Sequence, residues 1–265
     1  MDNVWRLIDS GNCTAAYNMA LDEALALSVR KGTAPPSLRL YGWAGPSVSL
    51  GRFQKISDID IEYCRSRTIP VVRRPTGGMA ILHDTELTYS FSVRTDRPPF
   101  SKGLIESYKS IGSTLTHALR RCGLEAEARE ERERGMVLAG SPLCFQSSSY
   151  GEILIDNKKI VGAAQKRWPD GLLQQGSVPY YYNEEMMQRI FRISRDIDLN
   201  RCMTGLKVVM PDLGADSFKD SLVRAFEDIF SIRFERSRPS EEELALALQL
   251  QEEKYLQDSW NLRLS

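Results

Sequence analysis

The sequence predicts an α+β fold, in which a mixed, largely antiparallel central sheet is flanked by helices and followed by a helical C-terminal extension over about residues 213–265. Two patterns lead to this prediction. Short apolar or alternating runs, typical of strands, occupy most of the first three quarters of the chain, whereas the last quarter has amphipathic helical periodicity. The region near residues 199–212 lacks the composition of a linker, so we expect residues 1–265 to form one domain.

Composition and charge narrow the class of protein. A chain with 42% hydrophobic and 26% charged residues is typical of a globular protein. The 35 basic and 35 acidic residues cancel, so we expect no partnership with nucleic acid or an anionic membrane. No apolar run approaches the ~20 residues of a membrane span, and the N-terminus does not resemble a signal peptide. We therefore expect a cytoplasmic protein.

The cysteines predict neither a disulfide frame nor a zinc site. They are odd in number, widely spaced and free of CxxC pairs, which indicates reduced thiols and no bound metal. The five are Cys13, Cys64, Cys122, Cys144 and Cys202.

The first half of the chain is expected to alternate strands with helices. Thr14 is placed to cap a helix over residues 15–29, and Gly32 ends it. Seven apolar residues three and four apart predict the clearest helix over residues 104–122, closed by Gly123. A shorter helical stretch is expected at residues 58–66. Strands are expected at residues 4–8, 38–41, 48–51, 69–72, 79–82 and 87–93.

The second half is expected to begin with a hairpin and to end in helices. Strands over residues 152–155 and 159–165 are joined by a turn at Asp156 and Asn157. A further strand is expected at residues 172–178. Predicted caps then mark three helices: Asn183 before residues 184–192, Ser217 before a helix through residue 229, and Ser240 with Glu243 as a capping box for a helix to about residue 254. The mixed-charge residues 125–134 fit either a connection or an exposed helix.

The first candidate site surrounds a pair of glycines. Arg73 and Arg74 end an apolar run, Gly77 and Gly78 follow, and His83 lies at the bend between two predicted strands. Arginine binds carboxylates and other anions, and glycine allows a ligand to approach the backbone closely. Two interpretations stay open at this point: a ligand-binding turn at a sheet edge, or a basic hairpin with an ordinary glycine-rich turn.

The second candidate site joins a cysteine to a lysine. Cys144 lies in a polar loop, and Lys159 opens a predicted strand fifteen residues later. Small residues follow that lysine, which suggests that its ammonium points into a cavity filled by something else. A nearby ammonium would lower the pKa of the Cys144 thiol and make it a better nucleophile. The alternative is a buried structural thiol and a solvated hairpin lysine.

Several of these stretches together resemble the biotin/lipoate protein ligase superfamily. The stretches are RRPTGGMAILHDTELTYSF, CFQSSSYGEILIDNKKIVGAAQ and LLQQGSV, with AAYNMALDEA and LYGWAGPSVSLGRFQ nearer the N-terminus. The ending EEKYLQDSWN is similar to that of the cysteine-dependent octanoyltransferases. The matches run in the same order over nearly the whole chain.

The resemblance implies a catalytic domain that moves a medium-chain acyl group without a cofactor. Cys144 would take an octanoyl group from acyl carrier protein as a thioester, and Lys159 would bind the acyl carbonyl or assist the cysteine. The acceptor would be the lysine of a lipoyl domain, as in the glycine cleavage H protein or the E2 component of 2-oxoacid dehydrogenases. The implied substrate-binding residues are Arg73, Arg74, Thr76, Gly77, Gly78, His83, Gly162, Ala164 and Gly176.

Three residues depart from the pattern of the superfamily. Met79 stands where Arg or Gly is frequent, Asn157 replaces a hairpin glycine, and Gln175 replaces a frequent histidine. Because Gln175 cannot act as a base, Lys159 is the better expected partner for Cys144.

Two other functions are compatible with the resemblance. An ATP-dependent lipoate–protein ligase would use ATP and Mg²⁺ to form an acyl-adenylate and would need no cysteine. A non-catalytic lipoyl-domain-binding protein or ligase partner would keep the fold alone. The Cys-Phe motif at its spacing from Lys159 favours the transferase.

Overall fold

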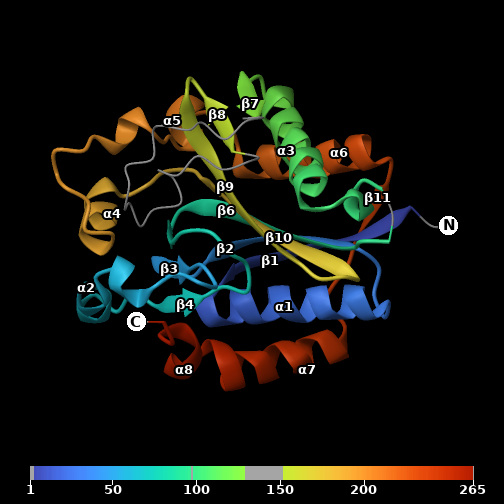
Figure 1. Ribbon diagram of the computed structural model, residues 1–265. Coiled ribbons are helices and arrows are strands. Elements are labelled where there is room, and N and C mark those ends of the chain that lie inside the picture. The colour runs from blue at the N-terminus through green and yellow to red at the C-terminus, as the bar shows by residue number, and fades with distance from the viewer. Residues whose placement is uncertain (1–2, 97, 129–151, 265) are drawn as a thin grey trace.

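The computed structural model describes residues 3–96, 98–128 and 152–264. Within these residues the main sheet has eight strands in the order β11-β1-β2-β6-β10-β9-β8-β7 (Figure 1). β1 runs parallel to β11 and β2, and the other neighbours are antiparallel, so the sheet is mixed as predicted. The eight strands of this sheet are β1 (Val4–Cys13), β2 (Ser37–Trp43), β6 (Glu86–Arg94), β7 (Ala126–Ala128), β8 (Ile153–Ile155), β9 (Lys158–Arg167), β10 (Gly171–Pro179) and β11 (Arg233–Arg236).

A second, three-stranded sheet carries the glycine pair. Its order is β4 (Val71–Arg73), β3 (Ser47–Leu50) and β5 (Ile81–His83). Together with the short helices α2 (Ile61–Ser66) and α4 (Glu184–Ile190), it encloses a separate apolar cluster that contains Val48, Cys64 and Ile190. The glycine turn therefore lies between two strands of a small, well-packed sheet.

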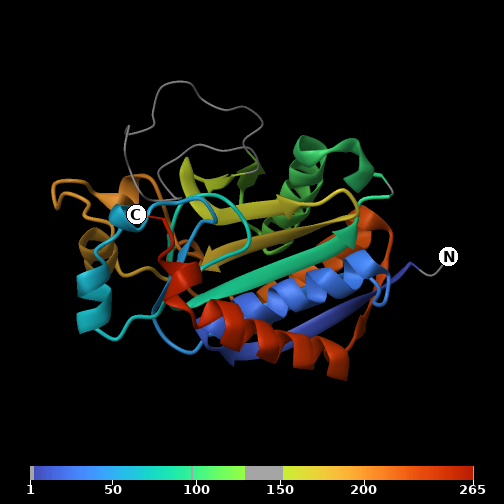
Figure 2. The same cartoon turned by 60° about the horizontal axis from the view of Figure 1, so that its bottom comes forward.

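Helices cover both faces of the main sheet. On one face α3 (Leu104–Arg121) and α6 (Ala215–Phe230) pack over a large core that includes Phe91 and Phe226. On the other face α1 (Ala15–Lys31) lies against the sheet, and α7 (Glu241–Leu250) covers α1 from outside (Figures 1 and 2). The chain then continues through a π-helical turn, η5 (Gln251–Tyr255), into α8 (Asp258–Asn261), beside β4.

Most locally encoded elements form as predicted. Asp156 and Asn157 both have positive φ, 51° and 60°, as a two-residue type I′ hairpin turn requires. The Asn183 side chain accepts from the N–H of Met186, and Ser240 and Glu243 form the predicted capping box.

Other local predictions were wrong or incomplete. α6 begins at Ala215 with Gly214 as its N-cap, so Ser217 lies in the first turn and does not cap the helix. β1 extends to Cys13 through an irregularity in its pairing between Asp9 and Asn12. Residues 126–128 form strand β7, because β8 is there to pair with it. The rest of the mixed-charge run, residues 129–134, lies outside the described residues.

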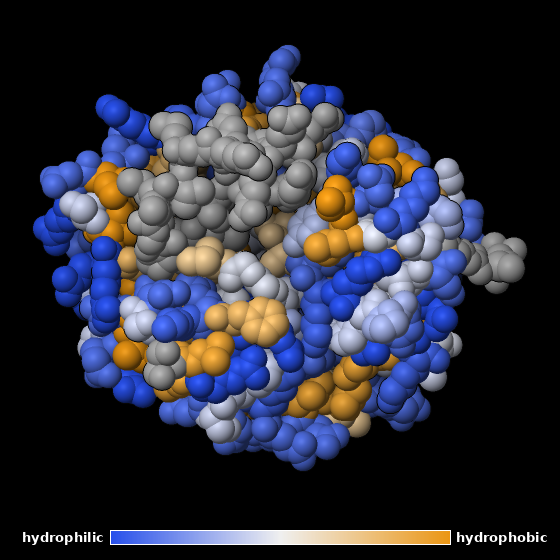
Figure 3. Space-filling view, viewed as in Figure 1, coloured by the Kyte–Doolittle hydropathy of each residue, from blue (hydrophilic) through white to orange (hydrophobic). Residues whose placement is uncertain are grey.

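The visible surface agrees with the balanced composition. The face in Figure 3 is mostly hydrophilic, with separated apolar patches. Among the helices that the structure describes, none has both the length and the apolar character needed to cross a bilayer.

Candidate active site

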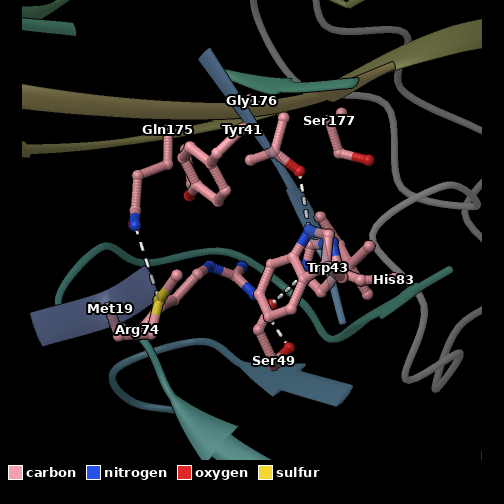
Figure 4. Close-up of a pocket in the computed structure, with 13 residues that line it drawn as sticks. Met19, Tyr41, Trp43, Ser49, Arg74, His83, Gln175, Gly176 and Ser177 are labelled. Carbon is pink, nitrogen blue, oxygen red and sulfur yellow. Dashed lines mark hydrogen bonds between the residues drawn. The ribbon is translucent and has the colours of Figure 1, made fainter. Parts of the chain in front are cut away.

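A pocket opens where the two sheets meet. It contains about 300 Å³ of space not filled by atoms, part of it open to solvent. Most of its walls are apolar or uncharged (Figure 4). The lining residues are Met19, Tyr41, Trp43, Ser49, Arg74, Ile81, His83, Thr88, Gly162, Ala164, Gln175, Gly176 and Ser177.

His83 forms part of a fixed wall of this pocket. Its ring stacks on Trp43 with the ring centroids 3.9 Å apart and the planes 12° apart. Arg74 donates to the Ser49 hydroxyl at 3.1 Å, so the hydroxyl proton is assigned to His83 Nε2, 2.7 Å away. The other ring nitrogen, Nδ1, then donates to Glu86 Oε1 at 2.9 Å. Both nitrogens of His83 are engaged within the wall, so the residue shapes the pocket.

A buried carboxylate, Asp22, organises the opposite wall. It accepts from Arg39 at 2.7 Å, Tyr41 at 2.8 Å, Ser90 at 2.6 Å and Gln175 Nε2 at 2.7 Å. Burial and the neighbouring carboxylate raise the pKa of Tyr41 well above its ordinary value, so the phenol keeps its proton. Such a fully paired carboxylate fixes the side chains that contact it.

Gln175 extends this network to the glycine turn. Its Oε1 accepts from Thr76 Oγ1 at 2.7 Å, while its Nε2 donates to Asp22. Thr76 itself is buried and does not line the pocket. Sequence reasoning assigned no role to Asp22; an acid within the apolar AAYNMALDEA helix was the signal that could have identified it.

The two arginines of the glycine motif point to different places. Arg74 lines the pocket and donates to the backbone carbonyls of Ser49, Gly77 and Met79 at 2.6–3.1 Å. Arg73 is directed away from the pocket and donates to the carbonyls of Gly51 and Gln54 and of a residue in α8. In this structure both guanidiniums support the backbone, and a role in anion binding stays a prediction.

The glycine turn packs closely against Gly51, the residue after β3. Gly78 has φ of 85°, a conformation that favours glycine. A Cβ on Gly51 would lie only 1.8 Å from the Gly78 carbonyl oxygen, so this contact requires glycine at 51 as well. A Cβ on Gly78 would lie 3.7 Å from Ala164 Cβ, so the turn lies close to β9.

A β-bulge directs Lys159 towards the pocket face. Lys159 pairs with Leu154, whereas Val161 pairs with Ile153, so β9 contains one extra residue between them. Residues paired across two strands lie on the same face of the sheet, whereas successive residues of one strand lie on opposite faces. Lys159 therefore lies on the face opposite to Val161, which is the face of Gly162.

The interpretation of Lys159 as a solvated hairpin lysine is wrong. Only 3% of its side chain is exposed, and its Nζ lies 2.6 Å from Glu152 Oε1, which is also buried. Its backbone pairs with residues 202 and 204, so the lysine is held from a third segment of the chain. A buried, ion-paired ammonium on the same face of β9 as the pocket residue Gly162 is suited to a carbonyl or oxyanion.

Cys144 lies outside the described residues, so its place relative to Lys159 stays a prediction. Two other cysteines have environments that disfavour a nucleophile. Burial raises the pKa of the Cys64 thiol to about 11 and also raises that of Cys202, so both thiols stay protonated at neutral pH. Cys122 is half-buried at the edge of the large core, and His117 is half-exposed with its Nε2 3.6 Å from Asp228 Oδ2.

Comparisons with known proteins identify related sequences and folds. The model of the lipoyl protein ligase A/B catalytic domain matches residues 14–227. The chain is 38% identical to the octanoyltransferase LipM of Kyrpidia tusciae and 33% identical to that of Bacillus subtilis, with 98% of each chain covered in both cases. Among solved structures, lipoate–protein ligase A bound with ATP matches with a TM-score of 0.82 at 24% identity, over the full length of both chains. The lipoate protein ligase of a bipartite Thermoplasma acidophilum system, described with its E2 lipoyl domain, has a TM-score of 0.82 at 23% identity, covering 100% of this chain and 98% of the other.

Proposed function

Because the chain belongs to the family of the lipoyl protein ligase A/B catalytic domain and is an octanoyltransferase of protein lipoylation, we propose that it acts through an acyl thioester on Cys144. The donor is octanoyl-acyl carrier protein. The acceptor is the lysine of a lipoyl domain in the cytoplasm, on the glycine cleavage H protein or a 2-oxoacid dehydrogenase E2. The reaction needs no nucleotide and no metal, because a thioester is already activated.

The chemistry proceeds in two exchanges. The Cys144 thiolate attacks the thioester carbonyl and forms a new carbon–sulfur bond. The carbon–sulfur bond to the carrier then breaks, the carrier thiolate leaves, and the acyl group stays on Cys144. The neutral amine of the acceptor lysine then attacks the Cys144 thioester and forms an amide. The bond to sulfur breaks, Cys144 leaves as the thiolate, and the proton lost by the amine passes to water. In both exchanges negative charge develops on the carbonyl oxygen.

The observation that carries this proposal is the buried Lys159 on the pocket face of β9. Its ammonium, oriented by Glu152 at 2.6 Å, supplies positive charge where that oxyanion forms. The apolar walls given by Met19, Trp43 and Ile81 suit an unbranched acyl chain. Gly162, Ala164 and Gly176 line the same pocket with little or no side chain, which leaves room for that chain.

One experiment tests both the reaction and its energy source. The purified protein is incubated with octanoyl-carrier protein and an apo lipoyl domain, without ATP, and all three are weighed by intact-mass spectrometry. We expect octanoylated lipoyl domain in the wild type, and an octanoyl adduct on the enzyme when the acceptor is left out. Cys144→Ser should form neither, because a serine hydroxyl is a far weaker nucleophile at neutral pH.

A ligase mechanism would give the opposite pattern. Modification of the lipoyl domain from free lipoate, ATP and Mg²⁺, with none from the thioester, would contradict the proposal. So would a Cys144→Ser variant that transfers at the wild-type rate. Cys122→Ser is the matched control, because that thiol packs at the edge of the core and has no assigned part in the reaction.

A further inference from the structure

The hydroxyl of Ser177 stands out among the polar groups of the pocket. Ser177 lies on β10 with 2% of its surface exposed, and its side chain lines the pocket. Within the described residues its Oγ has no hydrogen-bond partner, and Figure 4 shows it without a dashed line. A buried hydroxyl without a partner is costly, because folding removes it from water and returns nothing.

The other polar side chains around the pocket are paired. Gln175 is bonded at both ends of its amide, and Ser49 lies between Arg74 and His83. Thr88 on β6 is the register partner of Ser177 on β10. The Thr88 hydroxyl accepts a hydrogen bond from Trp43 and donates one to Glu86. Ser177 is therefore an exception within an otherwise satisfied network, as expected of a group whose partner is the ligand.

The position of Ser177 indicates which part of a ligand it meets. In the β9–β10 register Gln175 pairs with Ala164 and Ser177 pairs with Gly162, so Ser177 is the lining residue nearer the Lys159 end. Gly162 has no side chain to cover the hydroxyl. Towards the other end the walls are apolar or already paired, as at Met19 and Tyr41.

An octanoyl thioester has one good hydrogen-bond acceptor, its carbonyl oxygen, and an apolar tail. The tail suits the Met19 end of the pocket, which leaves the carbonyl at the end of Ser177 and Lys159. We propose that Ser177 Oγ donates a hydrogen bond to the carbonyl oxygen of the bound acyl group, and holds that oxygen as it becomes an oxyanion. This inference rests on the proposed octanoyl transfer.

The test compares Ser177→Ala, which removes the hydroxyl, with Ser177→Thr, which keeps it. The initial rate of octanoyl adduct formation on the full chain is measured at subsaturating octanoyl-carrier protein by intact-mass spectrometry. Thermal unfolding of each variant is followed in parallel. We expect Ser177→Ala to form the adduct about ten- to a hundredfold more slowly, with an unfolding temperature equal to or above that of the wild type. Ser177→Thr should recover most of the rate.

Thr116→Val provides a matched control. The Thr116 hydroxyl on α3 is also buried without a partner in the described part of the chain, but it is not among the pocket-lining residues. Its loss should leave the rate unchanged. A wild-type rate for Ser177→Ala, or a drop of several degrees in its unfolding temperature, would overturn the inference. Failure of the wild type itself to form the adduct would instead refute the octanoyl transfer on which the inference rests.

Discussion

The ion pair between Lys159 and Glu152 predicts that catalysis and stability depend on the same residue. Both side chains are almost fully buried, 3% and 6% exposed, with 2.6 Å between Nζ and Oε1. Lys159→Met removes the ammonium and leaves the Glu152 carboxylate buried without it, which typically costs ~3–5 kcal/mol. Against a total stability of ~5–15 kcal/mol, the variant should remain folded at 25 °C but unfold at a clearly lower denaturant concentration.

Activity should fall for a separate reason. A preorganised donor to an oxyanion is worth about a hundred- to a thousandfold in rate, so Lys159→Met should lose at least two orders of magnitude in octanoyl transfer. The double variant Lys159→Met with Glu152→Met separates the two effects, because replacing a buried pair by apolar side chains of similar size is often neutral for stability. We expect it to recover most of the lost stability and none of the lost activity.

The assay pairs denaturant unfolding with mass-spectrometric octanoyl transfer, and Lys158→Ala serves as the control. Lys158 is half-buried at the hairpin and has no assigned part in the site, so its loss should change the free energy of unfolding by no more than ~0.5 kcal/mol. The reasoning would be refuted by a Lys159→Met variant with the wild-type unfolding midpoint. Wild-type transfer by the double variant would refute the catalytic role of the ammonium.

Three further predictions concern the scaffold. Asn261→Ala removes the side-chain acceptor of the Arg73 backbone N–H, 2.9 Å away, and should cost ~1–3 kcal/mol in chemical unfolding. Gly176→Ala places a Cβ 2.2 Å from the buried ring of Tyr89 and should cost ~1–3 kcal/mol or more, read as a lower unfolding temperature. Burial lowers the pKa of Lys166 to about 8, so the unfolded chain binds more protons between pH 8 and 10.5 and this residue's contribution to stability rises over that interval. Lys166→Met should flatten that part of the stability–pH curve.

Each of these has an outcome that contradicts it. An Asn261→Asp variant keeps an acceptor oxygen and should lose less stability than Asn261→Ala; equal losses would mean that the bond to Arg73 contributes nothing. Unchanged unfolding of Gly176→Ala would mean that the sheet adjusts without strain. A curve for Lys166→Met that rises between pH 8 and 10.5 as in the wild type would assign the rise to another group.

The sequence predicts best what is encoded locally. The Asp156–Asn157 turn and the Ser240–Glu243 capping box depend on residues within three positions of one another, and both form as predicted. The strand order of the main sheet is not local, because β11 joins the edge of β1 from more than 200 residues away. No periodicity in the sequence carries that information.

The direction of Lys159 shows why the site itself is harder to predict. Strict alternation along β9 would place Lys159 on the face of Val161 and away from the pocket residues Gly162 and Ala164. The bulge reverses this, and it exists only because β9 pairs with β8 in one particular register. The hydrogen-bond network of Asp22 could not be predicted for a similar reason. Its partners on β2, β6 and β10 are adjacent only in the folded sheet.

The C-terminal segment supports the strand that leads into the glycine turn, although none of its described residues lines the pocket. Trp260 donates to the Arg73 carbonyl at 2.8 Å, and Asn261 accepts from both the backbone N–H and the guanidinium of Arg73. On its other side the same turn is tied to the main sheet by the bond from Thr76 to Gln175. The turn is therefore fixed from two directions, by the C-terminal helix and by the sheet. A substitution in α8 that loosens Arg73 should for this reason alter acyl transfer as well as stability, which gives a physical basis for the resemblance of the ending EEKYLQDSWN to that of octanoyltransferases.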